Sequence, residues 1–193
     1  MKEIRKSKEN ITSTERKIEG YAIVFDSLSE DMGFYETIDK RAMDGVIERS
    51  DCFALLNHDE SRGILARSKY GAGTLTLSVD DIGLRYEFEA PNTQLGDETL
   101  EMIKRGDIDG SSFAFTISEG GEKWEKIDGK YYRTISQIDR LYDISPVYQP
   151  AYQSTTCVAD TRGLDELKKA ENELVAYFSE LRARISDNNA EEK

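Results

Sequence analysis

Alternation of apolar and polar residues predicts two β-hairpins in this chain. Residues 74–90 place apolar side chains at every second position on either side of a turn, "DDIG"; they are Leu75, Leu77, Val79, Leu84, Tyr86, Phe88 and Ala90. One face of this hairpin therefore covers a core and the other contacts water. A second hairpin is predicted where "DG" at 128–129, which suits a type I′ turn, joins "KWEKI" to "KYYRTI".

Other apolar runs extend the strand-rich part of the chain in both directions. "IEGYAIVF", which opens at Ile18, is rich in β-branched and aromatic residues, whereas the charged residues before it predict a flexible N-terminal arm over 1–17. "CFALLNHD", residues 52–59, predicts a buried strand that ends at a polar edge. We therefore expect one domain over residues 18–158.

Helical patterns are short within this domain. Residues 39–48 contain helix formers interrupted by Gly45, which predicts a short helix or helical turn. Residues 97–105 predict a helix with Asp97 as its N-cap, acids in the first turn, bases in the last, and Gly106 after its end. The predicted fold class is mainly β with flanking helices (α+β).

The last part of the chain, residues 159–193, has a different pattern and predicts a helical tail. Its apolar residues recur at intervals of three and four, broken only by Glu171; they are Leu164, Leu167, Leu174, Phe178, Leu181 and Ile185. Three heptads are marginal for an isolated coiled coil. The amphipathic helix either docks on the domain or pairs with a partner, and self-association is one such pairing.

Composition limits the class of protein. A chain of 193 residues with 38% apolar and 9% aromatic content is expected to form one globular domain with an additional segment. No run approaches the length of about 18 apolar residues that a membrane span needs, and the N-terminus lacks the apolar middle of a signal peptide. These patterns predict a cytoplasmic protein that does not bind membranes.

Charge and cysteine content exclude further classes. The 26 basic and 38 acidic residues leave a net charge of −12, which disfavours nucleic acid as a ligand. Two cysteines, Cys52 and Cys157, in a chain without an export signal are expected to be reduced thiols. One histidine with two distant cysteines is also too few ligands for a typical zinc site, so no metal is expected.

The chain contains a single histidine, His58, where the apolar run "FALL" gives way to acidic residues. A lone histidine at a strand end is commonly a surface residue without a chemical task. The alternative is a general base, which requires a nucleophile elsewhere. Cys52 is a poor candidate, because six strand residues separate it from His58 by roughly 20 Å at about 3.3 Å per residue.

A serine pair offers a better nucleophile. In "GDIDGSSFAFTIS", residues 106–118, Ser111 shares its strand face with Phe113 and Phe115, whereas Ser112 shares the opposite, more polar face. Ser112 is therefore the candidate that could meet both substrate and base. A third group, which would orient the imidazole, is expected from Asp139 or Asp143; alternation puts both on one strand face and does not choose between them.

Three segments in order, "LLNHD", "GDIDGSSFAF" and "LYDISPVYQPAY", resemble the prohead (capsid maturation) serine protease family of tailed phages, which is similar to the herpesvirus assemblins. "IEGYAIVF" also resembles that family's first strand, so the similarity covers roughly residues 18 to 155. The resemblance implies His58 as the base, Ser112 as the nucleophile and Asp143 as the third catalytic member. Asp143 stands where Glu is common in the family, and Pro146 replaces an aliphatic residue.

The resemblance also implies a fold and a function. The fold would be an assemblin-like antiparallel β-barrel flanked by helices, with no cofactor. The substrates would be the scaffolding protein or the scaffolding segment of the major capsid protein, and the protease itself, inside an immature capsid in the host cytoplasm. The rival hypothesis is a non-enzymatic scaffold or assembly protein that uses the β-rich body as a platform and the terminal helix for pairing.

Overall fold

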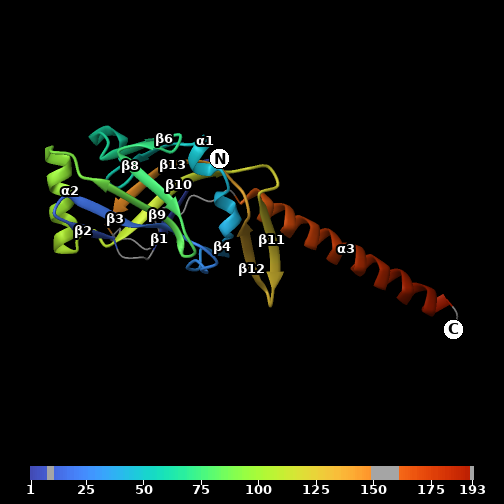
Figure 1. Cartoon of the computed structure of the whole chain (residues 1–193). Helices are drawn as coiled ribbons and strands as arrows, with labels where there is room; N and C mark the ends of the chain where they lie inside the picture. The colour runs from blue at the N-terminus through green and yellow to red at the C-terminus, as the bar shows by residue number, and fades with distance from the viewer. Residues whose placement is uncertain (8–10, 149–160, 192–193) are drawn as a thin grey trace.

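A computed structural model describes residues 1–7, 11–148 and 161–191 of the chain, with side chains described in the last helix as far as residue 179. Strands dominate the body, and one long helix extends away from it (Figure 1). Cys157 and the predicted boundary between domain and tail, at 158–159, lie outside the described residues.

Three sheets form the body. The six-stranded sheet contains, in spatial order, β1 (Glu3–Ser7), β10 (Gly110–Ile117), β13 (Ile138–Val147), β5 (Asp51–Ala54), β6 (Ala66–Lys69) and β7 (Ala72–Gly73). The four-stranded sheet contains β2 (Thr12–Thr14), β3 (Lys17–Val24), β9 (Gly83–Glu89) and β8 (Leu75–Val79). The three-stranded sheet contains β11 (Glu122–Ile127), β12 (Lys130–Ile135) and β4 (Tyr35–Ile38).

The structure confirms a mainly β fold with flanking helices. The helices are η1 (Lys40–Met43), α1 (Val46–Arg49), η2 (Glu60–Arg62), α2 (Gln94–Arg105) and α3 (Arg162–Glu191). None of the three sheets closes on itself within the described ranges, so the closed assemblin-like barrel is not observed.

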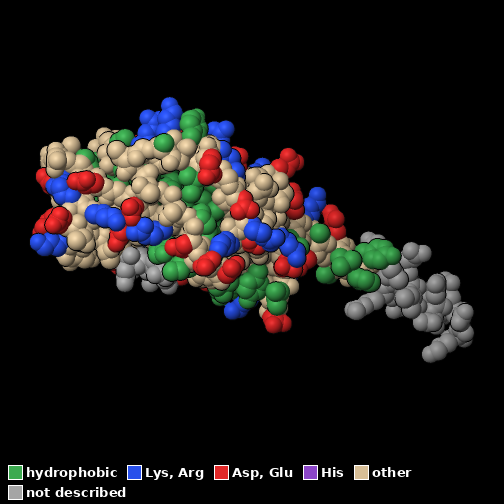
Figure 2. All heavy atoms as spheres, in the orientation of Figure 1, with side chains coloured by type: hydrophobic (Ala, Val, Ile, Leu, Met, Phe, Trp, Pro, Cys, Tyr) green, Lys and Arg blue, Asp and Glu red, His purple; other side chains and the backbone are tan. Residues whose placement is uncertain are grey.

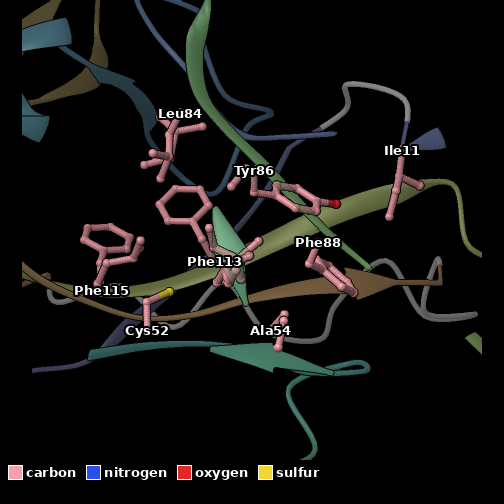
Figure 3. Packing of buried hydrophobic residues seen from close by; sticks show 14 of the residues in the cluster. Ile11, Cys52, Ala54, Leu84, Tyr86, Phe88, Phe113 and Phe115 are labelled. Atoms are coloured by element: carbon pink, nitrogen blue, oxygen red, sulfur yellow. The ribbon is translucent and has the colours of Figure 1, made fainter. Parts of the chain in front are cut away.

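The core lies between the six-stranded and the four-stranded sheets. The side chains of Tyr86 and Phe88 in β9 and of Phe113 and Phe115 in β10 are all buried and belong to one hydrophobic cluster (Figure 3). Each of the two strands stacks its own aromatic pair, with ring centroids 6.3 Å apart in β9 and 5.1 Å apart in β10. The alternation of apolar residues therefore predicted the inward face of both strands.

Both predicted hairpins are present, and their turns follow from local chemistry. Asp128 and Gly129 have φ values of 49° and 79°, the left-handed pair that a type I′ turn requires. In the other turn, the Asp80 carboxylate accepts hydrogen bonds from the backbone N–H groups of Ile82 and Gly83, at 2.8 and 2.9 Å. The side chain thus closes the turn between β8 and β9.

Helix boundaries differ from the sequence prediction in one case. The helix predicted at 97–105 begins three residues earlier, because the side chain of Thr93, rather than that of Asp97, accepts a hydrogen bond from the first turn. Gly106 ends it with a φ of 79°, as predicted. The helical segment near residues 39–48 is divided at Gly45, whose φ of 65° separates η1 from α1.

The expectation of a flexible arm over residues 1–17 is wrong for the two strands that it contains, β1 and β2. β1 pairs antiparallel with β10, and Glu3 and Arg5 point inward although both are charged. Their partners are Glu36 and Arg133: the Arg5 guanidinium contacts Glu36 at 2.6 and 2.7 Å, and Arg133 contacts Glu3 at 2.6 and 2.7 Å. Burial of these charges is possible because each is paired.

The first part of the terminal helix docks on the body, which is one of its two predicted roles. Leu164 is buried, Gly163 lies against Trp124, and Glu171 accepts hydrogen bonds from Lys126 of β11 and Tyr131 of β12, at 2.7 and 3.2 Å. Beyond Glu171 the helix leaves the body, and its apolar side chains are exposed (Figure 2); they are Leu174, Val175, Tyr177 and Phe178. Among the residues whose side chains are described, the helix therefore contacts the body at its beginning alone.

Candidate active site

The two adjacent serines of β10 point to opposite faces of the sheet, as alternation predicted. The hydroxyl of Ser111 hydrogen-bonds to that of Tyr86 at 2.6 Å, in the core between the sheets. Ser112 lies opposite Ser145 of β13 and beside Lys6 of β1, so β10 holds it between two neighbouring strands. Strand pairing on both sides therefore fixes the backbone at Ser112.

His58 reaches Ser112 from the loop that follows β5. The strand ends at Ala54, earlier than the predicted range of 52–59, and both Asn57 and His58 adopt left-handed backbone conformations with φ of 55° and 60°. The Asn57 N–H donates to the Pro146 carbonyl at 3.0 Å, which ties this turn to β13. The imidazole Nε2 consequently lies 2.6 Å from Ser112 Oγ, although 54 residues separate the two in sequence.

Asp143 of β13 contacts the other side of the imidazole. Its Oδ1 lies 2.5 Å from His58 Nδ1 and accepts a hydrogen bond from the Ser145 hydroxyl at 2.9 Å, while the Lys2 ammonium lies 3.3 Å from Oδ2. Burial by itself would raise the pKa of Asp143, but the hydrogen bonds and the nearby positive charges outweigh it and hold the pKa below its ordinary value. Asp143 is therefore a buried carboxylate at neutral pH.

Asp139 does not reach the histidine. The pairing of β10 with β13 shifts register twice, between Ala114 and Phe115 and again between Thr116 and Ile117, which leaves Asp139 without a partner in the ladder. Its neighbour Thr116 lies four residues along β10 from Ser112, so Asp139 is at the other end of the strand pair from the imidazole. Asp139 is exposed and accepts a hydrogen bond from the Thr116 hydroxyl at 3.3 Å.

The Ser112 hydroxyl has a second neighbour that the sequence did not indicate. It donates to the backbone carbonyl of Arg5 in β1 at 2.7 Å, and the Ser112 side chain is 4% exposed. A hydroxyl has one proton, so it cannot be given to the Arg5 carbonyl and to His58 at the same time. The contact with β1 therefore competes with the serine–histidine hydrogen bond.

Other candidate groups are not part of this arrangement. Cys52 is a free, buried thiol, and burial raises its pKa well above the ordinary value, so it is inert as a nucleophile near neutral pH. Among the described residues no group of three or more His, Cys, Asp or Glu side chains could hold a metal ion. In the same part of the chain, no helix has the length and apolar content to cross a membrane.

Ser112, His58 and Asp143 thus form one chain of contacts, with Oγ to Nε2 at 2.6 Å and Nδ1 to Oδ1 at 2.5 Å. Each distance is within hydrogen-bond reach, and a serine, a histidine and a carboxylate in this order can perform nucleophilic acyl transfer. The imidazole Nε2 faces Ser112, and Nδ1 faces Asp143. Of the two acids that alternation left open, Asp143 is the one that contacts the imidazole.

This chain is similar to a known protein family and to a solved structure. The family model of the caudovirus prohead serine protease matches residues 2–170. No curated protein matches the chain. Among solved structures, the chain is similar to the capsid assembly protease of bacteriophage T4, with 12% identity, a TM-score of 0.48, and coverage of 78% of this chain and 97% of that one.

The family match confirms the resemblance seen in the sequence and does not favour a non-enzymatic scaffold. Because it spans most of the chain, this protein belongs to the caudovirus prohead serine protease family, whose members are serine peptidases of capsid maturation.

Proposed function

We propose that Ser112 is the nucleophile, His58 the general base and acid, and Asp143 the group that orients His58 in a prohead maturation endopeptidase. The observation that carries this proposal is the unbroken chain of short contacts from Ser112 Oγ through the imidazole to Asp143. A buried carboxylate on Nδ1 holds the proton there and leaves Nε2 free to accept another.

The reaction proceeds in two steps. Ser112 Oγ attacks the carbonyl carbon of the scissile peptide bond while its proton passes to His58 Nε2, and the same proton is then given to the leaving amine as the C–N bond breaks. Water next attacks the acyl-enzyme ester, His58 takes a proton from the water, and that proton returns to Ser112 when the ester bond breaks. Asp143 stays ionised and stabilises the imidazolium in both steps.

Substrate binding must also redirect the Ser112 proton. In the free protein the Arg5 carbonyl accepts from the Ser112 hydroxyl at 2.7 Å. For attack the hydroxyl must donate to His58 instead, since only Nε2 can take up the proton. Loss or lengthening of the contact between Ser112 and Arg5 is therefore part of the formation of a reactive complex.

The substrates that family membership supports are capsid-assembly proteins. We assign to the enzyme the cleavage of a scaffolding protein, or of the scaffolding segment of the major capsid protein, and of its own chain, inside the prohead. The net charge of −12 does not favour direct binding of nucleic acid. Self-association through α3 stays a prediction, which size-exclusion chromatography with light scattering of the full chain and of Phe178→Asp would test.

A serine-directed fluorophosphonate tests the assignment of the nucleophile. We expect covalent labelling at Ser112, no labelling of Ser112→Ala, and retention of labelling in Ser111→Ala, whose hydroxyl contacts Tyr86 instead of His58. Cut sites in a co-expressed capsid protein, mapped by mass spectrometry, should disappear in Ser112→Ala. A folded Ser111→Ala that is inactive beside an active Ser112→Ala would contradict the assignment.

A further inference from the structure

Ser145 is a buried residue that contacts both His58 and Asp143 but takes no direct part in the proposed reaction. It lies in β13 with no exposed surface, directly opposite Ser112 in the neighbouring strand. Its hydroxyl donates to Asp143 Oδ1 at 2.9 Å and lies 3.3 Å from His58 Nδ1. A third contact comes from the backbone N–H of His58, which donates to Ser145 Oγ at 3.3 Å.

The contact with the His58 backbone bears on how the base is held. Asn57 and His58 are consecutive non-glycine residues in the left-handed region, a conformation that costs free energy and persists only when neighbouring groups enforce it. Two groups of β13 enforce it here: the Pro146 carbonyl accepts from the Asn57 N–H, and the Ser145 hydroxyl accepts from the His58 N–H. The latter is the contact closest to the imidazole itself.

The contact with Asp143 bears on how the acid is held. Oδ1 accepts from both His58 Nδ1 and the Ser145 hydroxyl, so the carboxylate is fixed in rotation as well as in position. The hydrogen bond from Ser145 is also one of the interactions that lower the pKa of Asp143. A serine hydroxyl has one proton and two lone pairs, which suffice for one donated and one accepted hydrogen bond.

We propose that Ser145 is a positioning residue that locks the His58 backbone and the Asp143 carboxylate in one geometry; this inference rests on the proposed roles of Ser112, His58 and Asp143. Replacement by alanine removes one oxygen atom and leaves the volume of the site nearly unchanged. The imidazole then gains freedom to leave the line between Ser112 and Asp143. Because small displacements of a catalytic group lower rates steeply, we expect a loss of about 10- to 100-fold in turnover with little change in KM.

The matched control is Ser111→Ala. Ser111 is also fully buried, lies in the adjacent strand and has one side-chain hydrogen bond, to Tyr86, but it does not contact His58 or Asp143. A general cost of deleting a buried serine hydroxyl should therefore appear equally in both variants, as a similar fall in melting temperature. Only Ser145→Ala should slow the reaction of Ser112.

The experiment measures the rate constant of fluorophosphonate labelling at Ser112 in the full chain, with thermal unfolding in parallel. Ser145→Ala should label about 10- to 100-fold more slowly than the parent, and Ser111→Ala within a few-fold of it. In an Asp143→Asn background, Ser145→Ala should have a much smaller effect, since residues that act through one another are not additive. Ser145→Cys, whose thiol is somewhat larger than the hydroxyl and donates only weakly, should behave like Ser145→Ala and carries the test if the alanine variant does not fold.

Each outcome separates this inference from the assignment on which it rests. Labelling of the parent at Ser112 together with equal rates in Ser145→Ala and Ser111→Ala would overturn the positioning role alone. Full multiplicative losses in the Asp143→Asn background would also overturn it, because they would indicate an independent structural effect. A folded parent that is not labelled at Ser112 would overturn the proposed function, and the role of Ser145 with it.

Discussion

Replacement of Asp143 by asparagine tests the least direct of the three assignments. Asn keeps the shape of the side chain but removes its charge and one acceptor. Oδ1 now accepts from His58 Nδ1 at 2.5 Å and from Ser145 at 2.9 Å, while Oδ2 faces the Lys2 ammonium at 3.3 Å. An amide oxygen in place of Oδ1 would therefore turn its NH₂ group toward a cation.

The opposite orientation of the amide is no better for catalysis. It would place the NH₂ group against Nδ1, which must then accept the hydrogen bond, and the imidazole proton would move to Nε2. Nε2 faces Ser112 at 2.6 Å and could no longer take its proton. Either orientation impairs the base, and we expect a loss of about 10³- to 10⁴-fold in turnover, equivalent to about 4 to 5.5 kcal/mol of transition-state stabilisation.

Two measurements distinguish this catalytic effect from a structural one. Thermal stability should stay near that of the parent, because the variant removes a buried charge and retains the size of the side chain. The acidic limb of the pH–rate profile should move to lower pH, since the carboxylate that stabilises the imidazolium is gone. Asp139→Asn is the matched control: Asp139 is exposed, so its rate should stay within a few-fold of the parent.

The reverse behaviour of the two variants would refute the reasoning. A large loss in Asp139→Asn with an active Asp143→Asn would transfer the third role to Asp139. Full activity in both variants would leave Ser112 and His58 as a dyad. A marked fall in the melting temperature of Asp143→Asn would show that its loss of activity cannot be attributed to the base.

Two further predictions follow from the same site and its support. His58→Ala should lose as much activity as Ser112→Ala, and the double variant should be little worse than either, because members of one catalytic unit are non-additive; independent multiplicative losses in a peptide-cleavage assay would count against a shared mechanism. Arg133→Met should lower the free energy of unfolding by about 3 to 5 kcal/mol in urea titrations, because Glu3 and Glu36 would be left buried with only Arg5 between them. A fall in the free energy of unfolding of less than about 1 kcal/mol would show that the ion pairs of Arg133 contribute little to stability.

Local sequence patterns determine much of the body. Period-two alternation identified the hairpin of β8 and β9 and its inward face, except at Val79, which is exposed. It also separated Ser111 from Ser112 on opposite sides of β10. The Asp-Gly pair at 128–129 determined its turn, because few other residue pairs adopt two positive φ values in succession. In each case the information lies within a few neighbouring residues.

The N-terminal strand was missed because its signal is the opposite of a hydrophobic pattern. Glu3 and Arg5 alternate toward the interior, but charged residues indicate an exposed segment unless their partners are known. Those partners are Glu36 and Arg133, which lie 31 and 130 positions away from Arg5 and Glu3, respectively. Tertiary structure alone shows that the four charges pair.

The same limit applies to the candidate site. The sequence by itself supplied one histidine, two serines on opposite faces of a strand, and two possible acids. It did not determine which acid lies beside the turn that carries His58: Asp143 contacts the imidazole, whereas Asp139 contacts Thr116. Nor did it indicate the left-handed turn at His58 or the contact of Ser112 with the Arg5 carbonyl, 107 residues away. Alternation depends on adjacent residues and can be read from the sequence. The register of strand pairing, and the contacts between distant side chains, depend on which strands pair, and only the folded chain decides this.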